Sequence, residues 1–414
     1  MRDVFVLGSF TTPFRRAPEK THHDLTREAL EGVLADAGIE ASRIDATYFG
    51  SAALHVFGQP NIGGQVLLLP LAREGKYPHE APITNVEGGC ATGGLALMAA
   101  RAAVASGDCE VALALGVEKV FLPEAPQKMW ELFEGGTDRL RATEARALYA
   151  EKAAFCGGVF EPHPARITIL DAVALEASWH MARYGTTKAQ LAYVASKNHA
   201  HGVKNPNAQY REAMSVEAVL ADKGVVGPFT RSMCAPISDG AAAVLVGSRE
   251  ALLSLGSTRP RVRVTSIAAA NGTRTSPDMP SVTTFAAKKA FAKAKLTPSD
   301  VHLAEVHDAT AFAEIAATED LGLCPSGEGG AFAVSGATSH GGRVPVNLSG
   351  GLESKGHPLA ASGLAMAHEL TLHLTGRAEE RQSGSPSVGL FHNAGGLVGF
   401  DEATAVVGLL VREG

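Results

Sequence analysis

Apolar residues along this chain follow two spacings that predict short buried strands alternating with amphipathic helices. Val4–Gly8 is a short continuous apolar run, typical of a buried strand. Thr21 resembles the first residue of a capping box, and apolar residues recur at helical spacing over Leu25–Ala37. Ala46–Gly50 is the next predicted strand. This order of strand, helix and strand indicates a βαβ unit.

The same order of elements returns in the second half of the chain. Thr284–Lys295 predicts a helix rich in alanine and lysine, and Val301–Val306 predicts the strand after it. A second similarity pairs Cys90–Ala102 with Pro358–Leu370, because each is a turn of small residues that leads into an apolar helix. Two copies of one α/β half explain both similarities, and we expect buried, parallel sheet in each.

The residues between these halves have a different character, since they are more polar and contain both tryptophans of the chain. Ile169–Tyr184 and Thr187–His199 predict helices there, and the segment is too long for a loop. We therefore expect an inserted subdomain that covers the active site. The predicted division is an N-terminal half over 1–120 plus 224–258, an inserted loop subdomain over 121–223, and a C-terminal half over 259–414.

Cys90 lies at the break between an apolar run that starts at Pro82 and a helical run that ends near Ser106. Glycines precede it, and Val111–Val117 predicts a buried strand after the helix. A cysteine at a helix N-terminus among small residues is suited to act as a nucleophile, because unpaired N–H groups there favour a thiolate. The alternative is a free cysteine that simply fills space in the core.

Composition narrows the class of protein. The chain has 414 residues, 45% of them hydrophobic, and a net charge of −6, which gives no sign of a nucleic-acid interface. No segment was expected to cross a membrane, and the N-terminus reads as a strand rather than a signal peptide. The five cysteines show no metal-binding spacing and favour a reducing, cytoplasmic location. They are Cys90, Cys109, Cys156, Cys234 and Cys324.

Several motifs together resemble one family, although each alone would be weak. They are TPFRR (12–16), NVEGGCATGG (85–94), KNPNAQ (204–209), APISDGAAAVLV (235–246), EVHDA (305–309), PVNLSGGLESKGHPLAASG (345–363) and FHNAGGLVG (391–399). In this order they resemble the thiolases over essentially the whole chain, most closely the sterol-carrier-protein-2 type. The resemblance implies two pseudo-symmetric βαβαβαββ halves in an α-β-α-β-α arrangement plus an inserted loop subdomain.

The resemblance also implies roles for three side chains. Cys90 matches the nucleophile that becomes acylated, His357 the histidine that activates it, and His307 the position that helps to hold the thioester oxygen. We expect the two imidazoles on opposite walls of one pocket around Cys90. The alternatives are a structural histidine at 357, fixed between glycine and proline, and a hydrogen bond from His307 to its neighbour Asp308, which would otherwise belong to the pocket.

The same resemblance implies a second oxyanion hole, and it shows one position at which this chain departs from the thiolase pattern. The turn containing Asn393, Gly395 and Gly396 matches the turn whose N–H groups bind the oxyanion; an ordinary loop turn is the alternative. Thiolases need a second cysteine as acid/base, either at the position of Asn393 or, in the sterol-carrier type, at that of Ala309. Neither residue carries a thiol, and Cys324 is expected to lie away from the pocket. Acylation should therefore survive, whereas removal of an α-hydrogen should be impaired.

The predicted function is acyl-CoA-dependent acyl transfer through a Cys90 thioester, with formation or cleavage of a carbon–carbon bond. Two alternatives stay open within the enzymes: transfer to a non-enolate acceptor such as an aromatic carbon, and decarboxylative condensation. A weakly catalytic scaffold subunit is the alternative from another class. The resemblance implies coenzyme A thioesters as substrates, no permanently bound cofactor or metal, a homodimer or dimer of dimers, and in some relatives a small OB-fold, zinc-ribbon partner.

Overall fold

The computed structural model describes residues 2–163, 166–256 and 259–413, and within them nine strands form one mixed sheet. The strand order is β3-β2-β4-β7-β1-β8-β11-β10-β9. These strands are β1 (Val4–Thr11), β2 (Ala46–Gly50), β3 (Ile83–Val86), β4 (Val111–Glu118), β7 (Gly240–Ser248), β8 (Arg261–Asn271), β9 (Leu303–Glu305), β10 (Val388–Gly395) and β11 (Thr404–Glu413). A separate small pair consists of β5 (Gly224–Val226) and β6 (Phe229–Thr230).

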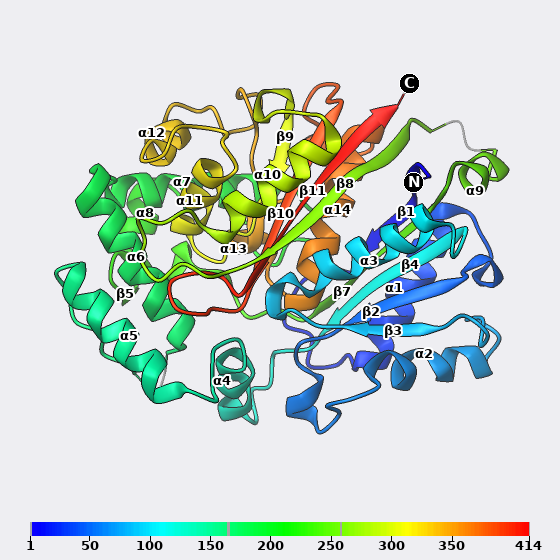
Figure 1. Cartoon of the computed structure of the whole chain (residues 1–414), viewed down its shortest axis with the longest axis horizontal. Helices are drawn as coiled ribbons and strands as arrows, with labels where there is room; N and C mark the ends of the chain where they lie inside the picture. The colour runs from blue at the N-terminus through cyan, green and yellow to red at the C-terminus, as the bar shows by residue number, and fades with distance from the viewer. Residues whose placement is uncertain (1, 164–165, 257–258, 414) are drawn as a thin grey trace.

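Helices form three layers around the two halves of this sheet (Figure 1). The middle layer is α3 (Thr92–Ser106) packed against α14 (Leu359–Thr375), and both helices contact strands of the two halves. Outside the first half lie α1 (His22–Ala37) and α2 (Gly63–Arg73); outside the second lie α10 (Val282–Ala294) and α11 (Ala311–Asp320). The α-β-α-β-α layering expected from the sequence is therefore confirmed.

Two details of the sheet differ from the expectation. Only β3-β2-β4 and β9-β10 pair in parallel, and the central strands pair antiparallel. The second half also has no counterpart of β3 among its described strands, since Val346 makes only an isolated parallel bridge with Ala304. Pro345, next to that bridge, has no N–H with which to extend a ladder. The two halves of the sheet are joined by the single pair Phe5 and Arg263.

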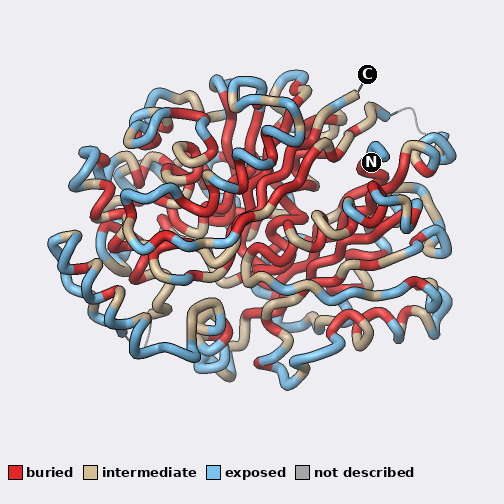
Figure 2. Tube along the Cα trace, in the orientation of Figure 1, coloured by how far each residue is buried: buried red, intermediate tan, exposed pale blue. Residues whose placement is uncertain are grey.

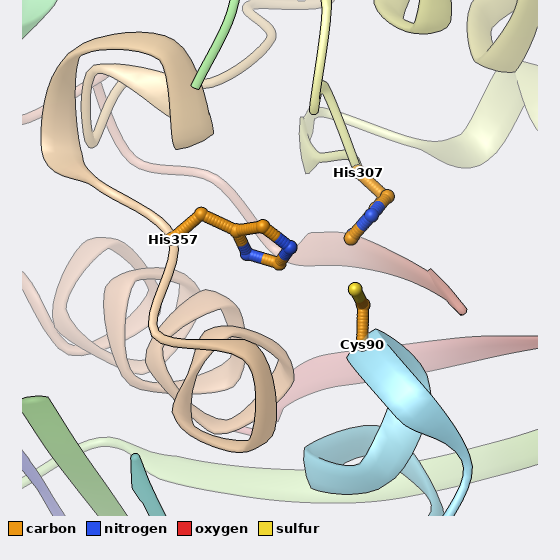
Figure 3. Close-up of side chains that lie close together, drawn as sticks. All are labelled: Cys90, His307 and His357. Carbon is orange, nitrogen blue, oxygen red and sulfur yellow. The ribbon is translucent and has the colours of Figure 1, made fainter. Parts of the chain in front are cut away.

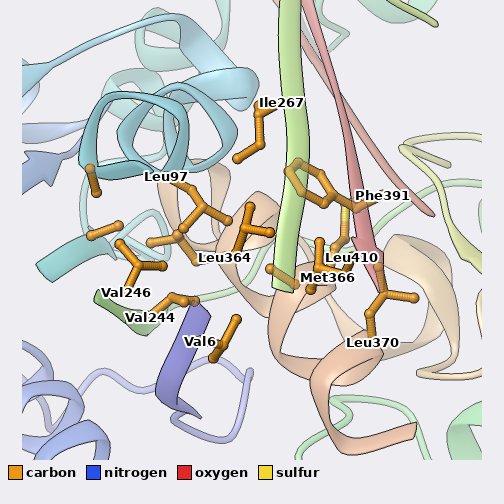
Figure 4. Packing of buried hydrophobic residues seen from close by; sticks show 14 of the residues in the cluster. Val6, Leu97, Val244, Val246, Ile267, Leu364, Met366, Leu370, Phe391 and Leu410 are labelled. Carbon is orange, nitrogen blue, oxygen red and sulfur yellow. The ribbon is translucent and has the colours of Figure 1, made fainter. Parts of the chain in front are cut away.

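Apolar packing between the two halves of the sheet surrounds α3 and α14. Figure 4 shows Leu97 of α3 and Leu364 of α14 meeting Val244 of β7 and Phe391 of β10. The stretch Gly89–Ser106 is long and apolar enough to cross a membrane, contrary to the sequence-based expectation. In the fold it is a central helix with 56% of its residues buried, so its apolar character serves the core of the molecule (Figure 2).

The inserted segment is helical and lies at the left of Figure 1. The predicted helices there are confirmed as α6 and α7, and the capping boxes at Thr21 and Thr187 are both present. The helices of the segment are α4 (Pro126–Glu134), α5 (Ala142–Phe155), α6 (Thr168–Tyr184), α7 (Lys188–Val203) and α8 (Val216–Ala221). The remaining short helices are α9 (Arg249–Ser254), α12 (Gly329–Val334) and α13 (Gly351–Lys355).

Candidate active site

Cys90 lies in a single 3₁₀ turn, Gly89–Ala91, between β3 and α3, as the sequence predicted. Gly89 has a φ of 56°, a left-handed conformation that residues with a side chain rarely adopt. The Thr92 hydroxyl accepts a hydrogen bond from Gly88 N at 2.9 Å and donates one to Gly89 O at 2.7 Å. These bonds hold Cys90 at the N-terminal end of α3.

Two glycines at the end of β10 let that strand touch the nucleophile turn. A Cβ atom on Gly395 would lie 2.4 Å from Ala91 N and 2.7 Å from Cys90 N, so only glycine fits there. Gly396 has a φ of 68° and directs its N–H toward the Cys90 sulfur, as does the N–H of Cys90 itself. The sequence predicted a turn from Asn393, but the strand continues to Gly395 and the turn begins at Gly396.

His357 is held so that one ring nitrogen stays free. Its backbone N–H donates to Ser238 Oγ at 3.1 Å, and its Nδ1 lies 2.8 Å from Ser362 Oγ. The Ser362 hydroxyl donates its one hydrogen to Pro358 O at 2.9 Å, so Ser362 Oγ accepts from His357 Nδ1–H. The buried Nε2 therefore carries a bare lone pair and has no hydrogen-bond partner. Such a nitrogen can accept a proton.

His307 reaches the same sulfur from the loop that follows β9 (Figure 3). Its ring and that of His357 touch edge to face with centroids 5.0 Å apart, so they are neighbours rather than opposite walls. One ligand atom from each histidine and the Cys90 sulfur all lie within 4.8 Å of one another. One thiol and two imidazoles at this spacing are also a donor set that zinc accepts.

Asn393 connects the segment that carries Cys90 with the segment that carries His307. Its Nδ2 donates to Cys90 O at 2.9 Å and lies 3.5 Å from His307 Nδ1, while its Oδ1 accepts from Gly94 N at 3.0 Å. The amide is completely buried. A donor facing His307 Nδ1 leaves the hydrogen of that ring on Nε2. Asn393 thus acts as a strut at a position where conventional thiolases were expected to carry a thiol.

Asp308, a sequence candidate for the pocket, is not part of the site around Cys90. The Asp308 carboxylate is fully buried and accepts from Leu352 N at 2.7 Å and from Asn198 Nδ2 at 3.1 Å, so it neither lines the cavity nor bonds to His307. Ala309 packs at the edge of the core, and its carbonyl accepts from Ala235 N. Of the five cysteines, all of which lie in the described part of the chain, only Cys90 joins the two histidines.

Sequence reasoning missed three residues that support the site. Glu118, at the end of β4, is completely buried and its carboxylate accepts four hydrogen bonds. Ser362 fixes the His357 tautomer, and its place one turn into α14 was the available signal. His392 Nδ1 accepts from His307 N at 3.4 Å, and its Nε2 bonds Thr283 Oγ1 at 2.8 Å.

The electrostatics of the site favour neutral groups. Burial, and secondly the Glu118 charge, raise the pKa of Cys90 to about 12, although the N–H groups of Cys90 and Gly396 oppose this. Burial lowers the pKa of His307 to about 4 and, together with the neighbouring His307, lowers the pKa of His357 well below its ordinary value. The N–H groups expected to favour a thiolate are present, but burial outweighs them, and these pKa directions favour a neutral thiol and neutral imidazoles at pH 7.

A cavity of about 750 Å³ opens onto Cys90. Leu132, Phe133 and Arg141 of the inserted segment line it together with Gly396. The inserted segment therefore contributes to the wall of the cavity, as a segment placed over the site would. The two histidines are not part of the lining, so a molecule in the cavity meets the sulfur and the glycine turn first.

A two-halved, layered α/β fold with a cysteine, two histidines and converging N–H groups is the architecture of an acyl-transferring enzyme. The family model "Thiolase, N-terminal domain" matches residues 4–225, and "Thiolase C-terminal domain-like" matches residues 268–408. The chain therefore belongs to the thiolase family.

Particular relatives agree with this class. An acetyl-CoA acetyltransferase from Methanothermobacter thermautotrophicus is 37% identical over the full length of both chains. Human sterol carrier protein 2 is 34% identical, over 95% of this chain and 70% of that one. The benzoylsuccinyl-CoA thiolase subunit BbsB from Thauera aromatica is 32% identical, over 88% and 87%. A solved structure titled Ltp2-ChsH2(DUF35) aldolase shares the fold, with a TM-score of 0.77, 21% identity and coverage of 99% and 98%. The protein is an acyltransferase of the thiolase type.

Proposed function

We propose that this enzyme takes an acyl group from a coenzyme A thioester onto Cys90 and passes it on with formation or cleavage of a carbon–carbon bond. The observation that carries the proposal is a histidine, His357, whose buried Nε2 is bare and which has a ring nitrogen within 4.8 Å of a thiol on which two N–H groups converge. A nucleophile, a base and donors for an oxyanion are what acyl transfer from a thioester requires.

In the first step the Cys90 thiol gives its proton to His357 Nε2 as the sulfur attacks the thioester carbon. The negative charge that develops on the carbonyl oxygen meets N–H donors, for which Gly396, Cys90 and the Nε2–H of His307 are available. The tetrahedral carbon then expels the coenzyme A sulfur, which takes the proton back from His357. The balance is one thioester exchanged for another, with no net change of charge.

Because both partners are neutral at rest, the ion pair of thiolate and imidazolium forms only as the bond to the acyl carbon forms. Among the described side chains, Glu118 and Glu87 act most strongly on the charge of Cys90, and because both are acidic they offer a lone thiolate no counter-charge. Donors placed for the oxyanion lower the energy of the attacked state more than that of the resting state, which is the condition for rate acceleration.

Intact-mass measurement after exposure to a panel of acyl-CoA thioesters tests the proposal. We expect one acyl adduct per chain, mapped to the Cys90 peptide, and no adduct on Cys90→Ala protein. Cys156→Ala is the matched control, since Cys156 is also partly exposed but ends α5. An adduct that persists in Cys90→Ala would overturn the proposal.

The candidate reactions differ in the acceptor that takes the acyl group from Cys90 in the second step. An enolate from a second acyl-CoA needs a base that neither Ala309 nor the fully engaged amide of Asn393 supplies. Acyl transfer to an aromatic carbon and decarboxylative condensation need no such base. Retention of both Cys90 and His357 speaks against a purely scaffolding subunit. Release of CO₂ from malonyl-CoA by acylated enzyme would single out the decarboxylative route.

Assembly is part of the same proposal. Strand β3 lies at one edge of the sheet, and its Thr84 and Asn85 are exposed, so a homodimer or dimer of dimers would cover that edge. The relative BbsB is named as a subunit, which supports a small partner protein here as well. We also propose a cytoplasmic location, consistent with five unpaired thiols. The mass of the purified protein in solution tests the dimer, and a strictly monomeric mass would contradict it.

A further inference from the structure

Glu118 is a fully buried carboxylate whose four hydrogen bonds go to two separate segments. Its Oε1 accepts from Ser51 Oγ at 2.8 Å and from Ala53 N at 2.9 Å, and its Oε2 accepts from Ala52 N at 3.0 Å. The fourth bond, also to Oε2, comes from Ala360 N at 3.0 Å. Every favourable acceptor position of the carboxylate is thereby used, so Glu118 cannot itself serve as a base.

The bond to Ala360 replaces a missing helix cap. Helix α14 begins after Pro358, which has no side-chain group with which to cap it. The Glu118 carboxylate comes from a different strand and satisfies an N–H of the first turn, where a negative charge is also favoured by the helix dipole. The backbones approach closely here: a Cβ atom on Gly116 of β4 would lie 2.1 Å from Ala360 O.

That first turn of α14 is the one that holds the base. Ser362, two residues after Ala360, accepts the Nδ1–H of His357. On the other side, Ala52, Ala53 and Leu359 belong to the same packed cluster as Cys90. Glu118 therefore forms hydrogen bonds to two segments: the first turn of α14, which follows His357, and the loop over 51–53, which packs beside Cys90.

We infer that Glu118 is a positioning residue which, by tying the loop over 51–53 to the first turn of α14, sets the place of His357 relative to the Cys90 sulfur. This inference rests on the proposed acyl transfer through Cys90. A shift of about 1 Å between two reacting groups can cost roughly 10²-fold in rate, so the tether has a direct consequence for acylation.

The test compares Glu118→Gln with Glu87→Gln. Glutamine keeps an oxygen for two of the four donors but presents an amide nitrogen to the other two. Glu87 is the matched control, because its carboxylate also acts on Cys90 electrostatically and lines the same cavity, yet it bonds only Gly89 N. Ser51→Ala removes one donor from the loop and leaves the bond to α14, which provides a second variant if Glu118→Gln folds poorly.

Two readouts are measured with acetyl-CoA and iodoacetamide as probes. We expect Glu118→Gln to acylate Cys90 about 10- to 100-fold more slowly than the native enzyme, and we expect Glu87→Gln and Ser51→Ala to lose clearly less than Glu118→Gln. Alkylation of the thiol should move the opposite way in Glu118→Gln, becoming faster at pH 8, because the carboxylate charge beside it is gone. Because exposure of the buried thiol would also lower its pKa, the Tm of each variant is measured alongside to separate loss of the carboxylate charge from general loosening of the structure.

Native-rate acylation by Glu118→Gln would overturn the inference, as would an equal loss in Glu87→Gln, which would reduce the effect to charge alone. Should Glu118→Gln not fold, Ser51→Ala takes its place: it weakens the tether on the side of the loop, so measurably slower acylation is expected and a native rate would overturn the inference. If the native enzyme forms no acyl adduct, the proposed function fails; the alkylation profiles of native protein and Glu118→Gln then still decide whether Glu118 acts on Cys90.

Discussion

Replacement of Asn393 by alanine should lower stability by an amount that the structure allows us to work out. Alanine removes the donor to Cys90 O and the acceptor for Gly94 N, and both backbone groups stay buried without a partner. An unsatisfied buried polar group costs about 1–3 kcal/mol, so the pair costs about 2–6 kcal/mol. The unfolding entropy of 414 residues is about 0.9 kcal/mol/K at the usual value per residue. Tm should therefore fall by about 2–7 °C.

Differential scanning calorimetry of native protein, Asn393→Ala and Asn61→Ala makes the comparison. Asn61 is exposed at the same cavity, and no hydrogen bond of its side chain is found in the described structure, so its loss should leave Tm within about 1 °C. Asn393→Asp keeps an oxygen for Gly94 N but turns a second oxygen toward Cys90 O, and it should melt at least as low. An Asn393→Ala protein that melts with the native enzyme would refute the role of the amide as a strut.

Three further outcomes are expected. Ser362→Ala removes the acceptor that fixes the His357 tautomer, so acylation of Cys90 should slow by about 10-fold or more while the adduct still forms; an unchanged rate in rapid-quench mass measurements would contradict this. The pKa of Cys90 near 12 means that its thiolate fraction, and hence its iodoacetamide alkylation rate, should rise about tenfold per pH unit from pH 7 to 10; a plateau below pH 9 would mean a thiolate–imidazolium pair at rest. Ala309→Cys should increase deuterium wash-in to acetyl-CoA over a slow native rate by restoring a thiol base, and rapid exchange by native protein would show that another group already acts.

The layered fold was predictable because its signals are local and repeated. The periodicity over Leu25–Ala37 and the small-residue turn before α3 and α14 each specify an element without reference to distant residues. The antiparallel pairing of the central strands was not predictable in the same way, because an apolar run such as β7 fits either direction. At Val346 a strand is reduced to an isolated bridge, next to Pro345, which has no N–H to donate. The spacing of apolar residues does not reveal such a missing donor.

The site shows the same division. The glycine-flanked turn of Cys90 and the Gly-His-Pro turn of His357 are visible in the sequence, and the structure brings both together with His307. The protonation state was missed, because the helix N-terminus was visible whereas the burial of the sulfur and the approach of Glu118 come from residues far away in the chain. The prediction for Asp308 was wrong for a related reason. Asp308 is next to His307 in sequence, but its side chain bonds Leu352 N and Asn198 and does not face the site.

The seam is the narrow contact between the two halves of the sheet, and the relative position of the catalytic groups depends on it. Cys90 belongs to the first half and both imidazoles to the second. The halves share one pair of strand residues, Phe5 and Arg263, and otherwise meet through apolar side chains and through side-chain hydrogen bonds such as those of Asn393 and Glu118. A small separation at this seam would disperse the three groups while each half kept its own sheet and helices. Heat or mild denaturant should therefore abolish turnover before circular dichroism records any loss of secondary structure, and the enzyme's useful lifetime is set by cohesion at the seam rather than by the stability of either half.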